Sequence, residues 1–165
     1  MKKRWMSLYV ENEVGVLARV SGLFSGKSYN LRSLTVGETQ DPTISRMTIC
    51  VDSDDATFEQ IKKQLNQFVE VIKVVDLTNV PVHMKEILYL KILTANDKER
   101  SFAYRISEVF GGKVVDMGRA GILMECLQTE TKNDDLIRLV SKEFANIEVV
   151  RGGSVAIESI SISER

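Results

Sequence analysis

The sequence predicts an α+β fold built from two tandem domains, each with the element order βαββαβ. The hydrophobic pattern changes between a period of two, typical of strands, and a period near 3.6, typical of helices, in the same order in both halves. Segment 69–73, VEVIK, also matches segment 147–151, IEVVR. A chain of 165 residues is long enough for two small domains, each near the lower size limit for a self-sufficient core.

The first half begins with a strand, a loop and a helix. Residues 4–10 alternate between two sets of side chains, as a strand does. Residues 11–31 then predict a loop, an amphipathic helix and a glycine exit at Gly26 into a second strand near Asn30. The apolar face of this helix is expected to contain Val16, Leu17, Val20, Leu23 and Phe24.

A hairpin, a second helix and a fourth strand complete the first half. Pro42 and its neighbours favour the hairpin turn, and Asp54 or Asp55 can cap the second helix. The expected strands are 31–38, 44–52 and 69–76. The helix between the last two places Phe58, Ile61, Leu65 and Phe68 on one face.

The second half repeats this order after a break around Pro81. We expect Asp134 and Asp135 at the start of its second helix, where negative charge favours the helix dipole. Its expected elements are strand 87–93, helix 97–110, strands 113–118 and 121–129, helix 133–145 and strand 147–151, with an apolar tail to Ile162. The predicted domains are 1–78 and 86–165, joined by a linker at 79–85, each an antiparallel sheet with two helices on one face.

Composition excludes several classes of function. The formal net charge of −1 leaves no basic excess for nucleic acid. Charged residues or glycine interrupt the apolar runs well before the length of about 20 residues that a membrane span needs, and the first residues lack a signal-peptide core. We therefore expect a cytoplasmic protein. Cys50 and Cys126 are isolated, so we expect neither a disulfide nor a metal site.

Motifs that would indicate catalysis are incomplete. Segment 22–28, GLFSGKS, has three residues between its glycines where a phosphate-binding loop needs four, and it ends a helix, so we interpret it as a helix terminus. His83, the single histidine, has no recognisable nucleophile beside it. A rival enzymatic hypothesis would use Asp116, Arg119 or the Glu125–Cys126 region, although the sequence brings no nucleophile and base visibly together there.

The loop with Asn12 and Gly15 indicates a binding site. Backbone N–H groups at a helix start have no intrahelical acceptors, and the helix dipole adds partial positive charge there. Such a loop can receive a small anion, for example a carboxylate. The alternative is that Asn12 is only a turn residue and Gly15 only a glycine at a helix start.

Residues 11–37, ENEVGVLARVSGLFSGKSYNLRSLTVG, followed by DPTISRMTI at 41–49, resemble the signature of the small regulatory subunits of acetolactate synthase. The resemblance extends over essentially the whole chain. It implies two ferredoxin-like domains, the first an ACT domain. It also implies a non-catalytic subunit that activates a separate thiamine-diphosphate-dependent subunit and confers feedback inhibition by a branched-chain amino acid, usually valine. The holoenzyme is then a transferase.

The resemblance further implies a homodimer formed through the ACT domain. The effector would lie between the first loop of one chain and the start of the second strand of the other. The implied effector-binding residues are Asn12, Gly15, Val16, Leu17, Ala18, Asn30 and Leu31. Amides 15–17 would receive the carboxylate, the carbonyl of Asn12 or Asn30 would accept from the ammonium, and Val16 and Leu31 could hold the apolar group.

By the same resemblance, no cofactor is bound by this chain. Thiamine diphosphate, magnesium and FAD are expected only in the catalytic partner. Two alternatives remain open: a stand-alone amino-acid-sensing ACT protein, and a structural assembly subunit without effector binding.

Overall fold

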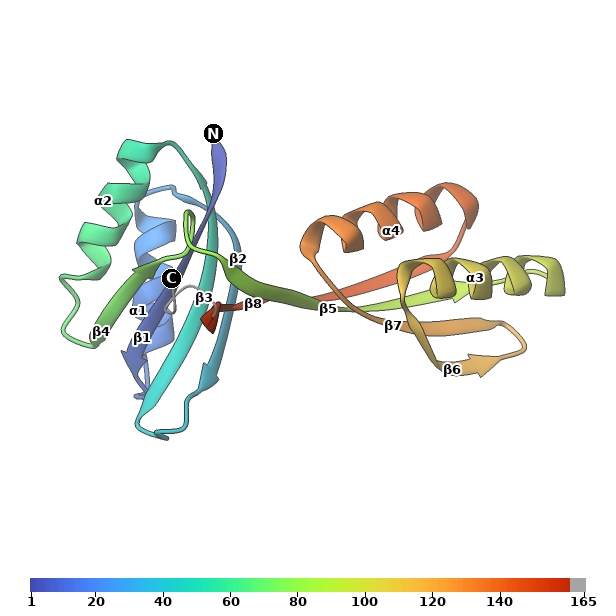
Figure 1. The fold of residues 1–165 in the computed structure, drawn as a ribbon, viewed down its shortest axis with the longest axis horizontal. Coiled ribbons are helices and arrows are strands. Elements are labelled where there is room, and N and C mark those ends of the chain that lie inside the picture. Colours follow the sequence, from blue (N-terminus) through green and yellow to red (C-terminus); the bar gives the residue numbers. More distant parts are fainter. Residues whose placement is uncertain (161–165) are drawn as a thin grey trace. The chain divides into compact units, whose positions relative to one another are not determined.

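The computed structural model describes residues 1–160, which form two compact units (Figure 1). The first unit contains Met1–His83 together with residues 155–160, and the second contains Met84–Ser154. This division differs from the sequence prediction, which assigned all of 86–165 to the second domain. The last strand leaves the second unit and ends in the first, because its final residues contact the first sheet. Both predicted βαββαβ orders are present.

The first domain is a four-stranded antiparallel sheet in the order β2-β3-β1-β4, with both helices on one face (Figure 1). Its elements are β1 (Lys2–Glu11), α1 (Val16–Gly26), β2 (Asn30–Glu38), β3 (Ile44–Ser53), α2 (Asp55–Leu65) and β4 (Val71–Asp76). Asp54 caps α2 by accepting from the Thr57 N–H at 2.7 Å, as one of the two predicted caps. Strand β2 lies at an edge of the sheet.

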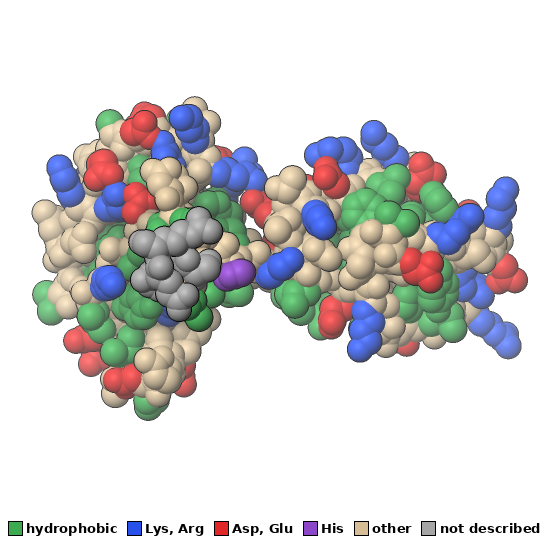
Figure 2. Space-filling model, viewed as in Figure 1, with side chains coloured by type: hydrophobic (Ala, Val, Ile, Leu, Met, Phe, Trp, Pro, Cys, Tyr) green, Lys and Arg blue, Asp and Glu red, His purple; other side chains and the backbone are tan. Residues whose placement is uncertain are grey.

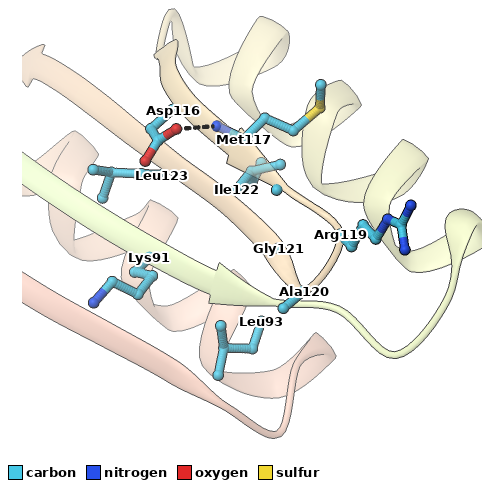
Figure 3. A pocket seen from close by; sticks show the side chains of 10 residues that line it. Lys91, Leu93, Asp116, Met117, Arg119, Ala120, Gly121, Ile122 and Leu123 are labelled. Atoms are coloured by element: carbon cyan, nitrogen blue, oxygen red, sulfur yellow. Dashed lines mark hydrogen bonds between the residues drawn. The ribbon is translucent and has the colours of Figure 1, made fainter.

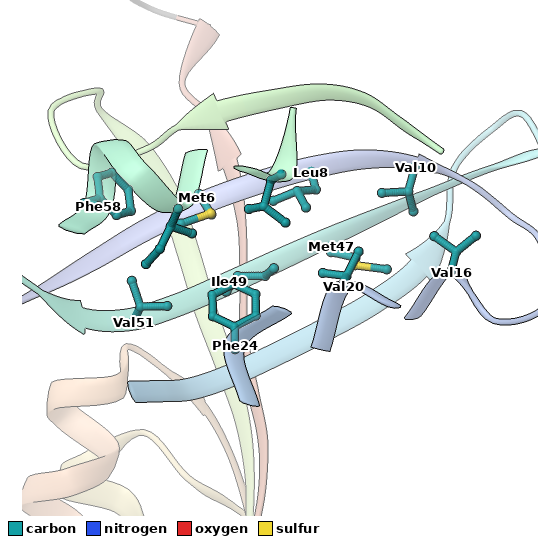
Figure 4. Packing of buried hydrophobic residues seen from close by; sticks show 12 residues of the cluster. Met6, Leu8, Val10, Val16, Val20, Phe24, Met47, Ile49, Val51 and Phe58 are labelled. Carbon is teal, nitrogen blue, oxygen red and sulfur yellow. The ribbon is translucent and has the colours of Figure 1, made fainter. Parts of the chain in front are cut away.

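The core of this domain lies between the helices and the sheet (Figure 4). Helix α1 buries the predicted residues Val16, Val20 and Phe24, but Leu17 is 44% exposed, because it stands at the border of the apolar face. Phe68 packs on this core from beyond the end of α2. The fully buried partners of the helices include Met6, Leu8, Val10, Met47, Ile49 and Val51.

The other face of the first sheet contacts the last residues of β8. The Ala156 N–H donates to Thr48 Oγ1 at 3.4 Å. The Arg46 guanidinium stacks 5.1 Å over the Tyr9 ring and donates to Glu158 Oε2 at 3.0 Å. These contacts explain why residues 155–158 belong to the first unit.

The second domain repeats the architecture with the strand order β6-β7-β5-β8. Its elements are β5 (Val82–Leu93), α3 (Asp97–Phe110), β6 (Lys113–Gly118), β7 (Gly121–Gln128), α4 (Glu130–Glu143) and β8 (Ile147–Glu158). Strand β5 begins inside the predicted linker, at Val82. The prediction for Asp134 and Asp135 is wrong: Thr129 caps α4, so both lie inside the helix.

Strand β5 shows that the second sheet has one buried face and one solvent-exposed face. Leu88, Leu90 and Ile92 are fully buried, whereas the alternating side chains, including Tyr89, are exposed to solvent. Glu86 is also buried, 4% exposed, and accepts from Arg151 through both carboxylate oxygens at 2.9 and 2.8 Å. The buried carboxylate is therefore paired, as its burial requires.

The surface carries both signs of charge. On the face seen in Figure 2, basic and acidic side chains are interspersed over both units, without a large patch of one sign. In residues 1–160, no helix combines the length and the apolar character that a membrane-crossing helix requires.

Candidate functional site

The loop before α1 leaves the start of that helix open. Gly15 is the N-cap residue, with φ at 89° in the left-handed region, and no side chain caps the helix. The first turn contains no acidic residue. Within residues 1–160, no acceptor bonds to the N–H groups of Gly15, Leu17 or Ala18. These N–H groups lie at the positive end of the helix dipole and can bind an anion from outside the chain.

The corresponding helix of the second domain, α3, is closed by its own side chains. Asn96 Oδ1 accepts from the Glu99 N–H at 2.9 Å, and Glu99 Oε2 accepts from the Ala95 N–H at 2.8 Å. This reciprocal pair resembles a capping box, with Glu99 accepting from the residue before the N-cap, so the start of α3 already holds a carboxylate. The open helix start of the first domain therefore has no counterpart at α3.

Asn12 uses its side chain to hold its own loop. Its Nδ2 donates to Glu38 Oε1 at 3.1 Å and to the Pro42 carbonyl at 2.9 Å, while its Oδ1 accepts from Ser45 Oγ at 3.0 Å. Both amide hydrogens and one of the carbonyl lone pairs are thus occupied. These contacts favour the structural interpretation of Asn12 over a direct bond to an ammonium group.

The turn that Asn12 contacts is itself fixed by hydrogen bonds. Asp41 Oδ1 accepts from Thr43 Oγ1 at 2.6 Å and from the Thr43 N–H at 2.9 Å. The bond from the Thr43 hydroxyl, followed by that from its N–H, lowers the pKa of the Asp41 carboxyl. The charged form of Asp41 is therefore favoured, and its two bonds to Thr43 fix the turn that Asn12 contacts.

The side chains of the predicted residues point in different directions. Val16 is 3% exposed and belongs to the core, so its side chain is unable to line an open site. Leu31 is half-buried and packs against the same core. Leu17 and Ala18 are exposed beside the open N–H groups. Of the predicted residues, Leu17 therefore offers a large apolar side chain that a ligand can reach, since it is 44% exposed.

A hollow of about 450 Å³ adjoins this loop. Its lining includes the carboxylate residues Glu11 and Glu13 but none of residues 15–18. The full lining is Glu11, Asn12, Glu13, Pro42, Thr43, Ile44 and Ile72. The open helix start therefore lies outside this hollow, and the hollow alone is not a carboxylate site.

Asn30, at the start of β2, has hydrogen-bonding partners that differ from those of Asn12. Its Nδ2 donates to Asp52 Oδ2 at 3.2 Å, and the Arg32 Nε donates to the same oxygen at 2.5 Å. In the described part of the chain, Asn30 Oδ1 has no hydrogen-bonding partner. Asn30 thus presents an open carbonyl acceptor, whereas the carbonyl of Asn12 already accepts from Ser45.

The two groups of predicted residues lie at opposite ends of β3. Asn12 contacts Ser45 near the beginning of that strand, whereas Asn30 pairs with Asp52 near its end. At ~3.3 Å per residue, seven positions separate these contacts by about 23 Å. A free amino acid is much shorter than this, so one chain does not bring Gly15 and Asn30 to the same ligand.

Comparisons with known proteins agree with the pattern of the first domain. Residues 6–73 match the family model described as AHAS small subunit-like ACT domain, and residues 85–160 match the model described as small subunit of acetolactate synthase. The acetolactate synthase small subunit of Aquifex aeolicus is 41% identical over 165 residues, 99% of this chain and 85% of the relative. The chain belongs to the family of acetolactate synthase small subunits.

Other members of the acetolactate synthase small subunit family are similar over nearly their whole length. The isozyme 3 small subunit of Escherichia coli is 37% identical over 155 residues, 94% of each chain. The crystal structure of the small subunit from Thermotoga maritima has a TM-score of 0.85 and 32% identity, and covers 96% of this chain and 98% of that one. The predicted family and the predicted fold of two tandem βαββαβ domains are both confirmed.

The residues of the rival enzymatic hypothesis lie in the second domain of this small subunit. Asp116 and Arg119 line a hollow of about 410 Å³ at the β6–β7 hairpin, where Asp116 Oδ1 accepts from the Met117 N–H at 2.8 Å (Figure 3). Cys126 is fully buried, and burial raises the pKa of its thiol, which disfavours the nucleophilic thiolate. Glu125 accepts from the Tyr89 hydroxyl at 3.0 Å. No nucleophile and base meet among these four residues.

Sequence reasoning missed the residues that hold the side chains of Asn12 and Asn30 in place. Glu38 and Ser45 fix Asn12, while Arg32 and Asp52 fix Asn30. Asp52 is 22 positions from Asn30, and Ser45 is 33 from Asn12. No local pattern connects such positions. The register of the β2–β3 hairpin could have paired Asn30 with Asp52, but only if the bulge near Arg32 had been known.

Proposed function

We propose that this chain is the regulatory subunit of a cytoplasmic acetolactate synthase, in the synthesis of the branched-chain amino acids. It activates the catalytic subunit and makes that subunit sensitive to feedback inhibition by a branched-chain amino acid, with valine as the first candidate. The observation that carries the proposal is the open start of α1 at Gly15 in a chain of this family. Thiamine diphosphate, magnesium and FAD then belong to the catalytic partner.

An amino-acid effector is supported by two separate groups in the chain, one that suits its carboxylate and one that suits its ammonium. The open N–H groups near Gly15 suit a carboxylate, and the Asn30 carbonyl suits an ammonium group. Leu17 offers apolar contact. Burying an isopropyl group contributes only ~1.5–3 kcal/mol, so the polar contacts set the orientation of the ligand.

A two-fold dimer would bring these separated groups together. Strand β2 is an edge strand, open to pairing with a second copy. If two copies of β2 pair antiparallel about a two-fold axis, the start of one strand, at Asn30, lies beside the end of the other, at Glu38. Glu38 contacts Asn12 of its own loop. The site would thus be shared between the loop of one chain and the strand start of the other.

The first test is binding. Calorimetry of the full chain with valine, leucine and isoleucine should detect binding of at least one of them, and sedimentation at micromolar concentration should detect a dimer. In the reconstituted holoenzyme the same amino acid should inhibit. Absence of binding to all three would leave a structural assembly subunit as the better interpretation, and a monomer in the presence of effector would count against the shared site.

The decisive test mixes two damaged chains. Asn30→Ala should weaken effector binding roughly ten- to a hundred-fold, since it removes one hydrogen bond to a charged group, worth ~1.5–3 kcal/mol. Gly15→Asp should block the carboxylate position. A heterodimer of the two variants then carries one doubly damaged site and one intact site. Titration should recover about one site per heterodimer, whereas recovery of none, with heterodimer formation verified, would mean that each site lies within one chain.

A further inference from the structure

We infer that Asp52 is a positioning residue of the effector site: it fixes which end of the Asn30 amide faces the ligand. This inference rests on the proposed function, and it assigns a role to a residue outside the loop and strand start already described. The observation that carries it is the hydrogen bond from Asn30 Nδ2 to Asp52 Oδ2, at 3.2 Å.

The chemistry of the two groups decides the orientation. A carboxylate accepts hydrogen bonds and has none to donate, so the amide of Asn30 must turn its NH₂ toward Asp52. Its carbonyl oxygen is then the free end. An ammonium group has the opposite requirement, because it only donates. Asp52 therefore holds Asn30 in the one orientation that can accept from an amino-acid ammonium.

Asp52 is itself held in place. Its side chain is 14% exposed and accepts from the Arg32 Nε at 2.5 Å, the same oxygen that Asn30 contacts. Arg32 lies between Leu31 and Ser33, where the pairing of β2 with β3 shifts register. A bulge of this kind redirects side chains at a sheet edge. Here both Asn30 and Arg32 reach one carboxylate, which makes it a fixed reference point.

Without Asp52, the amide of Asn30 would lose its preferred orientation. The NH₂ and carbonyl ends are nearly equal in size, so the side chain could turn over and offer a donor to the ammonium. Asn12 shows the contrasting arrangement, with its carbonyl directed to Ser45 and its NH₂ used by Glu38. By this proposal, Asp52 acts on the ligand through Asn30.

The test is a double-mutant cycle read by calorimetry on the full-length dimer with valine, leucine and isoleucine. Asp52→Asn keeps the size of the side chain and removes its acceptor-only character. We expect effector affinity to fall about tenfold, equivalent to ~1.4 kcal/mol. On the Asn30→Ala background, the same Asp52→Asn change should have no further effect, because the group it orients is absent.

A side-chain exchange provides the rescue. In the double variant Asn30→Asp with Asp52→Asn, the amide at position 52 can donate to one carboxylate oxygen at position 30, and the other oxygen is free to accept. Effector affinity should return to within about threefold of the wild type, or about 0.65 kcal/mol. A role of Asp52 in stability alone would not predict this recovery.

A matched control is available in the same domain. Asp76 accepts from Lys62 Nζ at 2.8 Å and from the Thr78 N–H at 2.9 Å and has no contact with Asn30. Asp76→Asn breaks a comparable ion pair. Because Asp76 does not orient Asn30, this change should leave effector affinity unchanged. Thermal unfolding and sedimentation of each variant check that fold and dimer persist.

The possible outcomes distinguish failure of the proposed function from failure of the role assigned to Asp52. If the wild type binds none of the three amino acids, the proposed function fails and this inference fails with it. If the wild type binds and Asp52→Asn binds equally well, only the role of Asp52 is refuted. Additive losses in the cycle would also refute it, since they would mean that Asp52 contacts the ligand directly or acts on the whole domain.

Discussion

Gly15 combines two properties that suit an open anion site. Its φ of 89° is a conformation that side chains disfavour, and a Cβ added to it would meet no atom within 4 Å. The position is thus strained for other residues but spatially open. We predict that Gly15→Asp abolishes effector binding and feedback inhibition, because its carboxylate would stand where that of the effector must lie. Activation of the catalytic subunit should be largely retained.

Gly22 provides the control for Gly15→Asp. It lies in the same helix, and a Cβ added there would also meet no atom within 4 Å, but it is away from the open helix start. Gly22→Asp should therefore leave effector affinity nearly unchanged in calorimetry. Equal loss of binding in both variants would indicate a general effect of charge on α1 and would remove this loop from the site.

The buried carboxylate of Glu86 makes the second domain sensitive to the loss of its partner Arg151. Arg151 donates to both its oxygens and to Asp134, and bonding to Glu86 raises the pKa of Arg151, so the pair stays charged. We predict that Arg151→Met destabilises the second domain by about 3 kcal/mol. This is the lower end of the range for breaking a buried ion pair, and we choose it because Arg151 is 32% exposed. Circular dichroism during urea unfolding measures it.

The control for Arg151→Met is Arg138→Met on α4. Arg138 and its partner Asp135 are 66% and 52% exposed, so their pair should contribute less than about 1 kcal/mol. Trp5, the single tryptophan, reports on the first domain, whose fluorescence transition should be the same in both variants. A similar loss of stability in the two variants would mean that Glu86 does not need its partner.

At the scale of elements, the β6–β7 hairpin depends on one close approach. A Cβ added to Gly121 would lie 2.2 Å from the Ile92 carbonyl oxygen, a backbone atom of the neighbouring strand. Gly118, at the other side of the same turn, has open space. We predict that Gly121→Ala destabilises the second domain by ~1–3 kcal/mol or more, because β5 and β7 must move apart to make room for the added methyl group.

Gly118→Ala is the comparison within this hairpin, and it should change the stability of the second domain by much less. Urea unfolding followed by circular dichroism measures both variants, with Trp5 fluorescence as the record of an unaffected first domain. Equal effects would show that the hairpin responds to any added side chain and that the contact with Ile92 has no special importance.

At the scale of the whole molecule, the end of β8 belongs to the first unit through Glu158. Its own backbone N–H, and then the Arg46 guanidinium, lower the pKa of the Glu158 carboxyl. Since the folded pKa is below the ordinary value near 4.5, this carboxylate stabilises the first domain above pH 4.5. The contribution is lost as the pH falls through the lower folded pKa.

We therefore predict that Glu158→Gln lowers the stability of the first domain at pH 7 by less than about 1 kcal/mol, because the pair is partly exposed. The difference from the wild type should shrink on acidification below the folded pKa. Trp5 fluorescence during unfolding at pH 7 and at a series of lower pH values measures this. Glu148→Gln, in the exposed pair with Lys91, is the control. A difference that grows at low pH would contradict the sign of the shift.

Local patterns in the sequence determined most of the elements. Helix 97–110 and strand 113–118 have the predicted bounds, and the helix after Gly15 ends at Gly26 as expected. Helical and strand periodicity act over a few residues, so they can be recognised without knowledge of the fold. The open start of α1 was recognisable for the same reason, because it depends on the residue types beside Gly15.

Only the tertiary structure decided which of the two amides keeps an open carbonyl and where residues 155–158 lie. The side chain of Asn12 is taken up by Ser45 and the β2–β3 turn, that of Asn30 is oriented by Asp52, and residues 155–158 return to the first sheet. Each of these contacts joins residues distant in sequence through strand pairing or strand packing. Register and packing are set by the whole hydrophobic pattern and by bulges, which leave no local signal.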